Sequence, residues 1–334
     1  MDPQEPASFN HRVEKLSTGR SYHFIDQKPG NFCSETPTLF LVHGFPDLWY
    51  GWRYQIGPWA RKGWRIVAPD MLGYGGTDKP SDTESYSIKR ICDDIAALLD
   101  LIGVEKVFLI GHDWGALISW RLCLWHPQRV HAVICLSVPF YPPALEYISN
   151  ADGAKRVPNF GYMVYFEDPR STKDIESDLS TFFNVLFRTP ERAIDFTKLG
   201  QIEKLVTGQL KPEHPGNILN TQELQYYLEN YKDAMLGPLS YYRNRKIRYE
   251  EEKDGKIPNS LPVTLPALFF HPMADGTCQK THVENSKKFV PSMTVVPLEG
   301  SGHWAMVERK EIVTDKVIKW VEERLLEQSP KSKL

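Results

Sequence analysis

The chain has 334 residues, of which 41% are hydrophobic and 25% are charged, which is typical of a globular protein long enough for one large domain with an insertion or for two domains. A net charge of −2 at pH 7 provides no basic surface for nucleic acid or anionic lipid, so we expect a small organic molecule as partner. The five cysteines lack C-x-x-C spacing, no apolar run could span a bilayer, and the amino terminus lacks the apolar core of a signal peptide; we expect a reducing compartment and a protein that is neither secreted nor membrane-spanning.

Short apolar runs alternate with helical patterns in the first part of the chain. The expected strands cover 22–25, as an edge strand, then 38–42, 65–68, 107–110 and 132–136, and the expected helices cover 91–102 and 116–125. Because strands that alternate with helices pair in parallel, the sequence predicts a mostly parallel, doubly wound α/β sheet. The tryptophans between residues 49 and 64 are expected to pack in its core.

The alternation stops at the prolines of residues 139–143 and resumes at 262–266. Between them the sequence has helical stretches, such as 180–187 and 221–231, and no convincing strand. We therefore predict a sheet domain in two parts, 1–142 and 263–334, with a helical cap inserted at 143–262. The second part should contain strands at 267–270 and 294–298, an amphipathic helix and a polar tail. The apolar positions of that helix are Ile312, Val313, Val317, Ile318, Trp320 and Val321.

Residues 111–115 read Gly-His-Asp-Trp-Gly and directly follow the buried strand 107–110. The two glycines indicate a tight turn between strand and helix with the spacing of a nucleophile elbow, and Asp113 is at its centre. A carboxylate can displace a leaving group from an sp³ carbon and so form an ester that water hydrolyses. The alternative is a structural Asp113 that caps the following helix, because aspartate is a favoured N-cap residue. The flanking glycines favour the catalytic role.

Hydrolysis of an ester at Asp113 requires hydrogen-bond donors for an oxyanion and a base for the attacking water. The expected donors are the backbone N–H groups of Trp114, next to the nucleophile, and of Phe45, in the His-Gly-Phe-Pro-Asp loop of residues 43–47. The expected base is His303, in the Gly-Ser-Gly-His-Trp loop of residues 300–304. A packed loop histidine is the alternative for His303.

The base also needs an acid to orient it, and two candidates follow the last strands. Asp275 lies just past the strand 267–270, whereas Glu299 lies next to the loop of His303. We expect Asp275 to have this role, which gives the chain order nucleophile, acid, histidine. We expect structural hydrogen bonds from the remaining polar residues of the loops, which are His43, Asp47, Asp70 and His112. No cofactor motif and no metal-binding spacing is present, so neither a cofactor nor a metal ion is expected.

Three motifs together are specific. Residues 43–46 (His-Gly-Phe-Pro), 111–116 (Gly-His-Asp-Trp-Gly-Ala) and 302–304 (Gly-His-Trp) resemble those of the soluble epoxide hydrolases of the α/β-hydrolase superfamily, and the resemblance extends over nearly the whole chain. It implies an α/β-hydrolase fold and a pair of cap tyrosines that hold the epoxide oxygen. Matched to the segments 160–166 and 237–244, the pair falls on Tyr162 and Tyr242. In these segments Tyr165 and Tyr241 are close rivals, and Ser240-Tyr241 replaces the Asn-Trp of the family.

The resemblance implies a hydrolase that converts a hydrophobic epoxide and water into a vicinal diol through a covalent aspartyl ester. Lipid or polyketide epoxides would suit an aromatic cap. Two alternatives remain open at this point. A haloalkane or haloacid dehalogenase shares the aspartate, the histidine and Trp114, although Phe45 and the paired cap tyrosines favour an epoxide. A non-catalytic binding protein of the same fold would retain the pocket alone.

The sequence ends in Ser332-Lys333-Leu334. At a free carboxy terminus this tripeptide is a peroxisomal address that an import receptor binds. The alternative is a solvated tail without function, which is common at chain ends. We expect a peroxisomal protein, or a cytoplasmic one if the address is not read.

Overall fold

The structure is a computed structural model that describes residues 1–328. Its centre is an eight-stranded sheet in the order β1-β2-β4-β3-β5-β6-β7-β8, in which β2 pairs antiparallel with β1 and β4, and the other neighbours are parallel. The strands are β1 (His11–Lys15), β2 (Ser21–Gln27), β3 (Thr38–Val42), β4 (Arg65–Pro69), β5 (Val107–His112), β6 (Val130–Leu136), β7 (Ala267–Pro272) and β8 (Met293–Leu298). The predicted doubly wound α/β sheet is confirmed.

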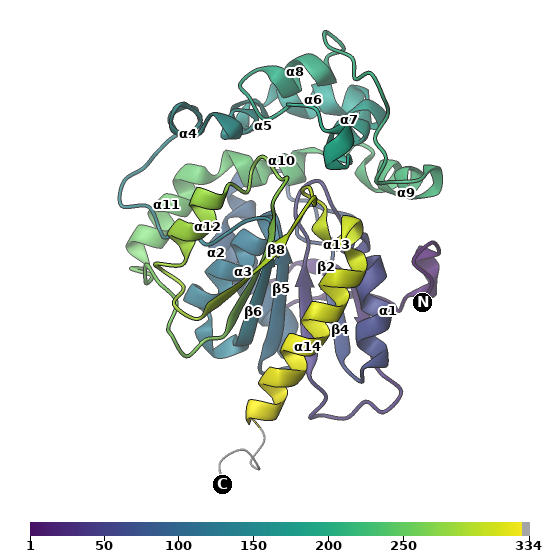
Figure 1. Cartoon of the computed structure of the whole chain (residues 1–334), viewed down its shortest axis with the longest axis vertical. Coiled ribbons are helices and arrows are strands. Elements are labelled where there is room, and N and C mark those ends of the chain that lie inside the picture. Colours follow the sequence, from purple (N-terminus) through teal and green to yellow (C-terminus); the bar gives the residue numbers. More distant parts are fainter. Residues whose placement is uncertain (329–334) are drawn as a thin grey trace.

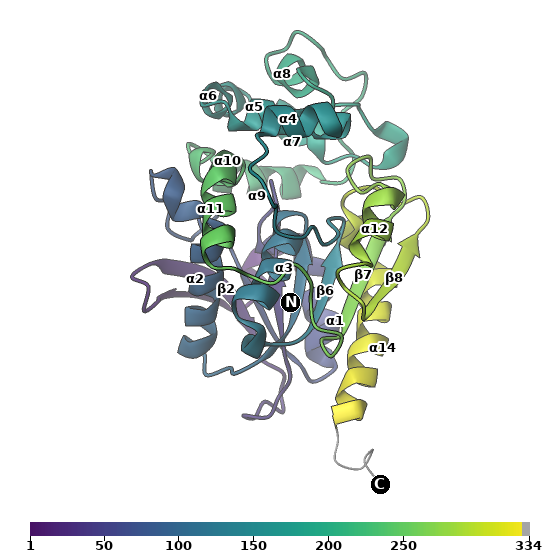
Figure 2. The same ribbon diagram turned by 90° about the vertical axis from the view of Figure 1, so that its left-hand side faces the viewer.

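Helices cover both faces of this sheet (Figure 1). One face carries α1 (Arg53–Arg61) and α14 (Lys310–Gln328), and the other carries α2 (Ile88–Leu101), α3 (Trp114–Trp125) and α12 (Lys280–Ser286), which face the viewer in Figure 2. The short α13 (Ala305–Glu308) precedes α14. Every residue of β3, β4 and β5 is buried, because helices pack on both sides of these apolar strands.

Between β6 and β7 the chain forms helices and connecting loops but no strand, and the structure describes all of this segment. They are α4 (Asn150–Arg156), α5 (Tyr162–Glu167), α6 (Arg170–Ser177), α7 (Leu179–Leu186), α8 (Gln201–Val206), α9 (Thr221–Tyr231), α10 (Leu236–Arg243) and α11 (Arg245–Asp254). Figure 1 shows α4 to α9 above the carboxyl ends of the parallel strands, whereas α11 lies lower, against α2 of the sheet domain. The exact cap boundaries of 143 and 262 stay predictions.

Two details of the sequence-based prediction were wrong. The strand predicted at 22–25 is not an edge strand, because β1 pairs outside it. The sequence of β1, His-Arg-Val-Glu-Lys, alternates between exposed and half-buried positions and has no apolar run, so it left no strand signal. In α14, Val313, Val317 and Val321 are buried, but Ile312 is 46% exposed and lies off the buried face.

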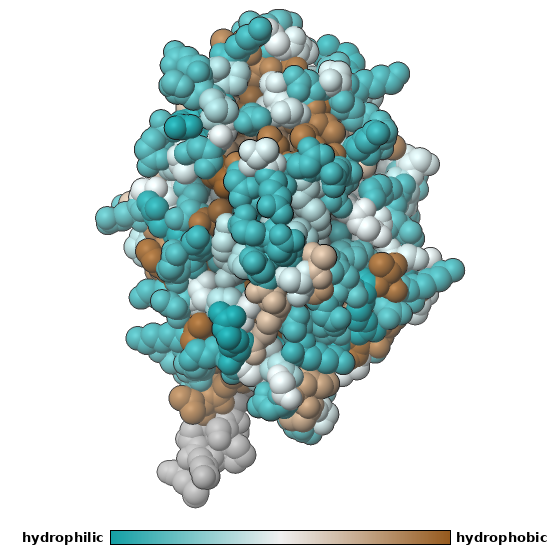
Figure 3. All heavy atoms as spheres, turned by 90° about the vertical axis from the view of Figure 1, so that its right-hand side faces the viewer, coloured by the Kyte–Doolittle hydropathy of each residue, from teal (hydrophilic) through white to brown (hydrophobic). Residues whose placement is uncertain are grey.

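The tryptophans between residues 49 and 64 are all buried, as expected for core packing. No helix among residues 1–328 is long and apolar enough to cross a membrane. The face shown in Figure 3 is mostly hydrophilic, and its apolar atoms gather mainly in the upper part, where the helical segment lies. Ser332, Lys333 and Leu334 are outside the described residues, so the peroxisomal address stays a prediction.

Candidate active site

Asp113 occupies a strained turn between β5 and α3, with φ 52° and ψ −120°. The glycines beside it permit this turn. A Cβ at Gly111 would lie 2.3 Å from the carbonyl oxygen of Gly115, and one at Gly115 would lie 2.0 Å from that of Val42. The Asp113 side chain makes no capping hydrogen bond to α3, which argues against the structural alternative and leaves the carboxylate free for another role.

The Asp113 carboxylate contacts two groups from other parts of the chain. Its Oδ1 accepts a hydrogen bond of 2.8 Å from the backbone N–H of Phe45, and its Oδ2 lies 3.5 Å from Nε2 of His303. Burial alone would raise the pKa of Asp113, but His303 and the Phe45 N–H outweigh burial and hold the pKa below its ordinary value. The carboxylate is therefore ionised near neutral pH, as a nucleophile requires.

His303 connects this carboxylate to Asp275. Its Nδ1 is 2.7 Å from Oδ2 of Asp275, whose Oδ1 accepts hydrogen bonds from the N–H and the hydroxyl of Thr277. Burial would lower the pKa of His303, but the two facing carboxylates raise it well above its ordinary value. Burial likewise opposes the ionised form of Asp275, and His303 and Thr277 lower its pKa overall. The rival Glu299 is exposed, and the ion pairs of His303 in the described part of the chain are with Asp113 and Asp275 instead.

The two histidines beside these motifs are structural. His43 Nδ1 donates to the carbonyl of Gly44 over 2.8 Å, because its Nε2 accepts from the N–H of Met71 over 2.9 Å. His112 Nε2 is 2.8 Å from the carbonyl of His303 and so holds the loop of that residue. Burial lowers the pKa of His43 to about 4 and that of His112 to about 3. Both rings are neutral at physiological pH.

The two expected oxyanion donors differ in their surroundings. The Phe45 N–H already binds the Asp113 carboxylate. The Trp114 N–H is at the first position of α3, where helix amides have no partner within the helix, and it donates no hydrogen bond within residues 1–328. The Trp114 N–H is therefore a free hydrogen-bond donor beside the nucleophile.

Tyr162, the first residue of α5, and Tyr242, in α10, are both buried, with ring centroids 6.2 Å apart. Burial, together with the negative charge of Asp113, raises both pKa values well above 10, so both phenols keep their protons. Their rivals are engaged elsewhere. Tyr165 donates to Asp174 over 3.0 Å, and Tyr241 donates to the carbonyl of Leu72 over 2.9 Å. No such bond to a carbonyl or carboxylate occupies Tyr162 or Tyr242 in residues 1–328.

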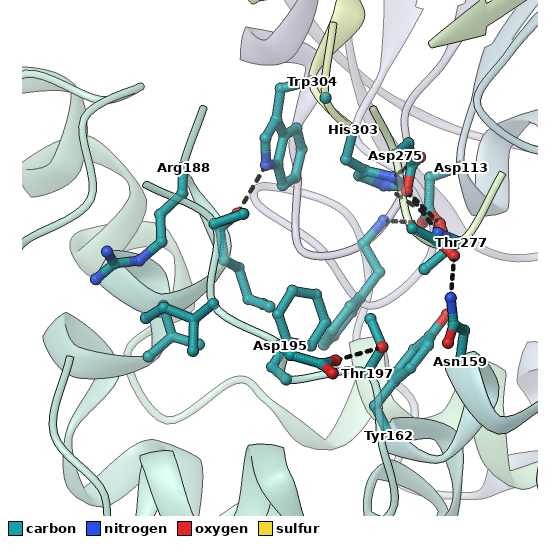
Figure 4. Close-up of a pocket in the computed structure, with 18 of the residues that line it drawn as sticks. Asp113, Asn159, Tyr162, Arg188, Asp195, Thr197, Asp275, Thr277, His303 and Trp304 are labelled. Atoms are coloured by element: carbon teal, nitrogen blue, oxygen red, sulfur yellow. Dashed lines mark hydrogen bonds and ion pairs between the residues drawn. The ribbon is translucent and has the colours of Figure 1, made fainter. Parts of the chain in front are cut away.

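Two cavities, of about 470 Å³ and about 340 Å³, meet at the nucleophile. Both are lined by Asp113, Tyr162, Tyr242 and Thr277. In the larger one, Asp113, Asp275 and His303 are grouped on the side of the sheet domain, and Tyr162 lies on the side of the helical segment (Figure 4). The arrangement can therefore hold an electrophilic carbon against a carboxylate while phenols from the other side bind its leaving oxygen.

Sequence reasoning missed two features of the site. Thr277 was not singled out. An aspartate in a turn commonly accepts a hydrogen bond from the backbone N–H two residues ahead, which here is that of Thr277. The smaller cavity also contains Arg121, Arg245 and Arg248, which no motif marked. Among residues 1–328, no cluster of three or more histidine, cysteine or acidic side chains could hold a metal ion.

The chain matches the family described as α/β hydrolase fold over residues 37–310. It is 31% identical to epoxide hydrolase A of Mycobacterium tuberculosis, with 85% of this chain and 90% of that protein covered. It is 29% identical to the bifunctional epoxide hydrolase 2 of Rattus norvegicus, with 99% of this chain covered, and it spans 59% of the length of that relative.

Solved structures give the same result. The crystal structure of epoxide hydrolase A from Mycobacterium thermoresistibile aligns with a TM-score of 0.80 at 30% identity and covers 94% of this chain and 98% of its own. An epoxide hydrolase from Vigna radiata aligns with a TM-score of 0.79 at 27% identity, over 96% of this chain and 99% of its own. With its fold, its Asp113 turn and these relatives, the chain belongs to the epoxide hydrolase family of the α/β-hydrolase fold.

Proposed function

We propose that this protein hydrolyses a hydrophobic epoxide to a vicinal diol through a covalent ester on Asp113. One observation carries the proposal: two buried phenols, Tyr162 and Tyr242, line the same cavities as an ionised carboxylate nucleophile. The relatives named above, which are epoxide hydrolases, support the same activity. The apolar lining of the larger cavity, which includes Phe45, Phe166 and Leu186, suits a lipid-like or polyketide-derived substrate.

In the first step Oδ2 of Asp113 attacks one epoxide carbon, because Oδ1 is held by the Phe45 N–H. The new C–O bond forms an ester as the ring C–O bond breaks. The ring oxygen leaves with the electron pair of that bond and takes a proton from Tyr162 or Tyr242. Pre-positioned donors of this kind contribute most where charge develops in a buried site.

In the second step Asp113 is an ester and its negative charge no longer raises the pKa of His303. The neutral imidazole of His303 then takes a proton from water, and the resulting hydroxide adds to the carbonyl carbon of the Asp113 ester. The N–H groups of Phe45 and Trp114 would bind the oxyanion. Collapse of this intermediate releases the second diol oxygen. Of the two protons of the water, one reaches that oxygen and the other restores the phenol. Asp275 orients His303 and stabilises its imidazolium form.

A single turnover in H₂¹⁸O with excess enzyme tests this mechanism. The substrates would be styrene oxide and fatty-acid epoxides, with mass analysis of both the diol and the protein. We expect unlabelled diol in the first turnover and ¹⁸O in the Asp113 peptide. Labelled diol would mean that water attacks the ring directly and would refute the role of Asp113. Halide release from chloroalkanes without epoxide turnover would favour a dehalogenase, and saturable binding without turnover would favour a binding protein.

The His303→Gln variant tests the two steps separately. It lacks the base for water but keeps the nucleophile, so we expect the ester to form and accumulate. Mass spectrometry of the intact protein should then find the substrate attached to Asp113. A variant that turns over at the full rate without an accumulated ester would contradict the role of His303.

We also propose the peroxisome as the location, on the grounds of sequence alone. Ser332-Lys333-Leu334 has the form of a peroxisomal address if it ends the mature chain. A fluorescent protein fused at the amino terminus should collect in peroxisomes, and removal of the last three residues should disperse it. Equal distributions of the two fusions would contradict the proposal.

A further inference from the structure

The smaller cavity beside Asp113 has a cationic wall. Arg121 reaches it from α3 of the sheet domain, and one face of α11 forms another part of its lining. Positions three and four residues apart share a face of an α-helix. The residues of α11 that line the cavity follow this spacing and are Arg245, Arg248, Tyr249 and Glu252.

The cavity is lined by three arginines and three carboxylates, but the carboxylates are not all placed to balance the arginines. Apart from Asp113, its lining contains only two carboxylates, those of Glu146 and Glu252. The Glu146 side chain is 75% exposed and lies 3.6 Å from Arg156, so it belongs to the outer rim. Glu252 is buried, and its two oxygens accept hydrogen bonds of 2.7 Å and 3.4 Å from Arg121. This ion pair connects α3 with α11, and it engages both carboxylate oxygens of Glu252.

Arg248 is the guanidinium with the weakest partner. Its side chain is only 18% exposed, its nearest carboxylate oxygen, on Glu252, is 4.0 Å from Nε, and it donates no hydrogen bond within the described residues. Burial lowers its pKa to about 10; Glu252 opposes this, and Arg121 and Arg245 add to it. Arg245 uses Nη1 to donate to Asn150 over 3.0 Å. A largely desolvated cation whose nearest carboxylate oxygen is 4.0 Å away is costly, and a bound anion would relieve that cost.

We infer that Arg248, supported by the neighbouring Arg245, binds a carboxylate at the far end of the substrate chain and is a specificity-determining residue. The substrate class is then an epoxide that carries a carboxylate, with its epoxide ring at Asp113. The hydrocarbon between the two groups would contact apolar residues of the same cavity, among them Leu117, Val138 and Met163. This inference rests on the proposed function, because the proposed nucleophile lines the cavity.

A matched pair of substrates tests the inference. Long-chain epoxy acids of graded length differ from their methyl esters in the charge and in a single methyl group. We expect the wild-type protein to prefer the acid by about 10- to 100-fold in kcat/KM, the range for a charge-assisted hydrogen bond. Arg248→Gln should lose this preference, and Arg248→Lys should keep part of it. Lys246→Gln, which removes an exposed cation outside the cavity on the same helix, should leave the preference unchanged. Equal kcat/KM for acid and ester in the wild type, or an unchanged preference in Arg248→Gln, would overturn the inference.

Binding of dodecanoate, measured by calorimetry, separates the inference from the proposed activity. This saturated acid has no reactive group, so its binding does not depend on turnover. We expect it to bind the wild-type protein at least about 10-fold more tightly than methyl dodecanoate and to lose that advantage in Arg248→Gln. If epoxides are not turned over but dodecanoate shows this pattern, the activity fails and the anion site stands. Equal affinity for acid and ester would overturn the site even if epoxides are hydrolysed.

Discussion

The two sides of the active site are held together by different kinds of contact. On the side of the sheet domain, Asp113, Asp275 and His303 are joined by polar contacts of 2.7 to 3.5 Å that leave little choice of orientation. On the helical side, Tyr242 is surrounded by rings instead. Its centroid is 5.1 Å from that of Phe45, 5.0 Å from Phe166 and 5.0 Å from Trp114.

This difference shows how the protein separates chemistry from selectivity. Directional hydrogen bonds fix the atoms that form and break bonds, and a small displacement of those atoms is costly. Aromatic packing has broad minima and adapts to shape. We therefore expect changes on the sheet side to abolish activity and changes on the helical side to reduce it or to shift substrate preference.

The largest effect is expected for Asp113→Ala. The variant lacks the atom that forms the ester, so kcat should fall by about 10⁴-fold or more, as for other removed nucleophiles. Steady-state diol formation measures this, and the circular dichroism spectrum should match that of the wild type. Full activity in a folded variant would show that the sheet side does not hold the nucleophile.

The next effect is expected for Asp275→Asn, which we predict to slow turnover by about 10²- to 10⁴-fold through loss of His303 orientation. The pKa of His303 is raised partly by Asp275, so the rise of ester hydrolysis with pH should move to lower pH in the variant. Single-turnover rates from pH 5 to pH 9 measure both changes. Glu299→Gln is the control, because this residue is exposed, and its rates should match the wild type. Equal losses in the two variants would argue against Asp275.

A smaller effect, on the free energy of unfolding, is expected at a contact between the helical segment and the sheet domain. Tyr227 of α9 donates to Asp47 over 2.5 Å, and burial raises the pKa of Asp47 from 3.8 to about 6. Because the folded state binds this proton more tightly, the ionised carboxylate destabilises the fold by up to about 3 kcal/mol. The penalty is absent below pH 3.8 and complete above about pH 6.

Urea unfolding at pH 4.5 and pH 7.5 tests this prediction by comparing the wild type with Asp47→Asn. The wild type should lose more unfolding free energy between these two pH values than the variant does, by about 2 kcal/mol. Identical changes in the two proteins would mean that Asp47 titrates normally.

The smallest effects are expected for the phenols. Tyr162→Phe and Tyr242→Phe should each lower kcat/KM by about 10- to 100-fold, because the remaining phenol still donates to the epoxide oxygen. Tyr165→Phe and Tyr241→Phe are the matched controls, since their hydroxyls bind Asp174 and Leu72 instead, and we expect them to stay within about 3-fold of the wild type. If kcat/KM falls more in the two control variants than in Tyr162→Phe and Tyr242→Phe, the assignment of the tyrosine pair is reversed.

The accuracy of the sequence-based prediction also differed between the two sides. Buried strands such as β3 and β5 are apolar runs of ordinary length, so their positions were clear from composition. The edge strand β1 has a polar, alternating sequence and was missed. The helices at 180–187 and 221–231 were placed within a residue of α7 and α9, but their packing over the sheet could not be predicted, because aromatic contacts between distant segments leave no periodic signal.

Local sequence patterns were enough to identify the residues whose role depends on the local backbone. Asp113 is recognisable because its turn admits only glycine at positions 111 and 115, and His303 lies in a similarly marked loop. The folded chain was needed to choose between Asp275 and Glu299 as the partner of His303, and to show that Tyr165 and Tyr241 donate their hydroxyl protons elsewhere. It also brought Arg121 and Arg248 to one cavity. These decisions depend on the directions of side chains from segments far apart in the chain, which no local pattern encodes.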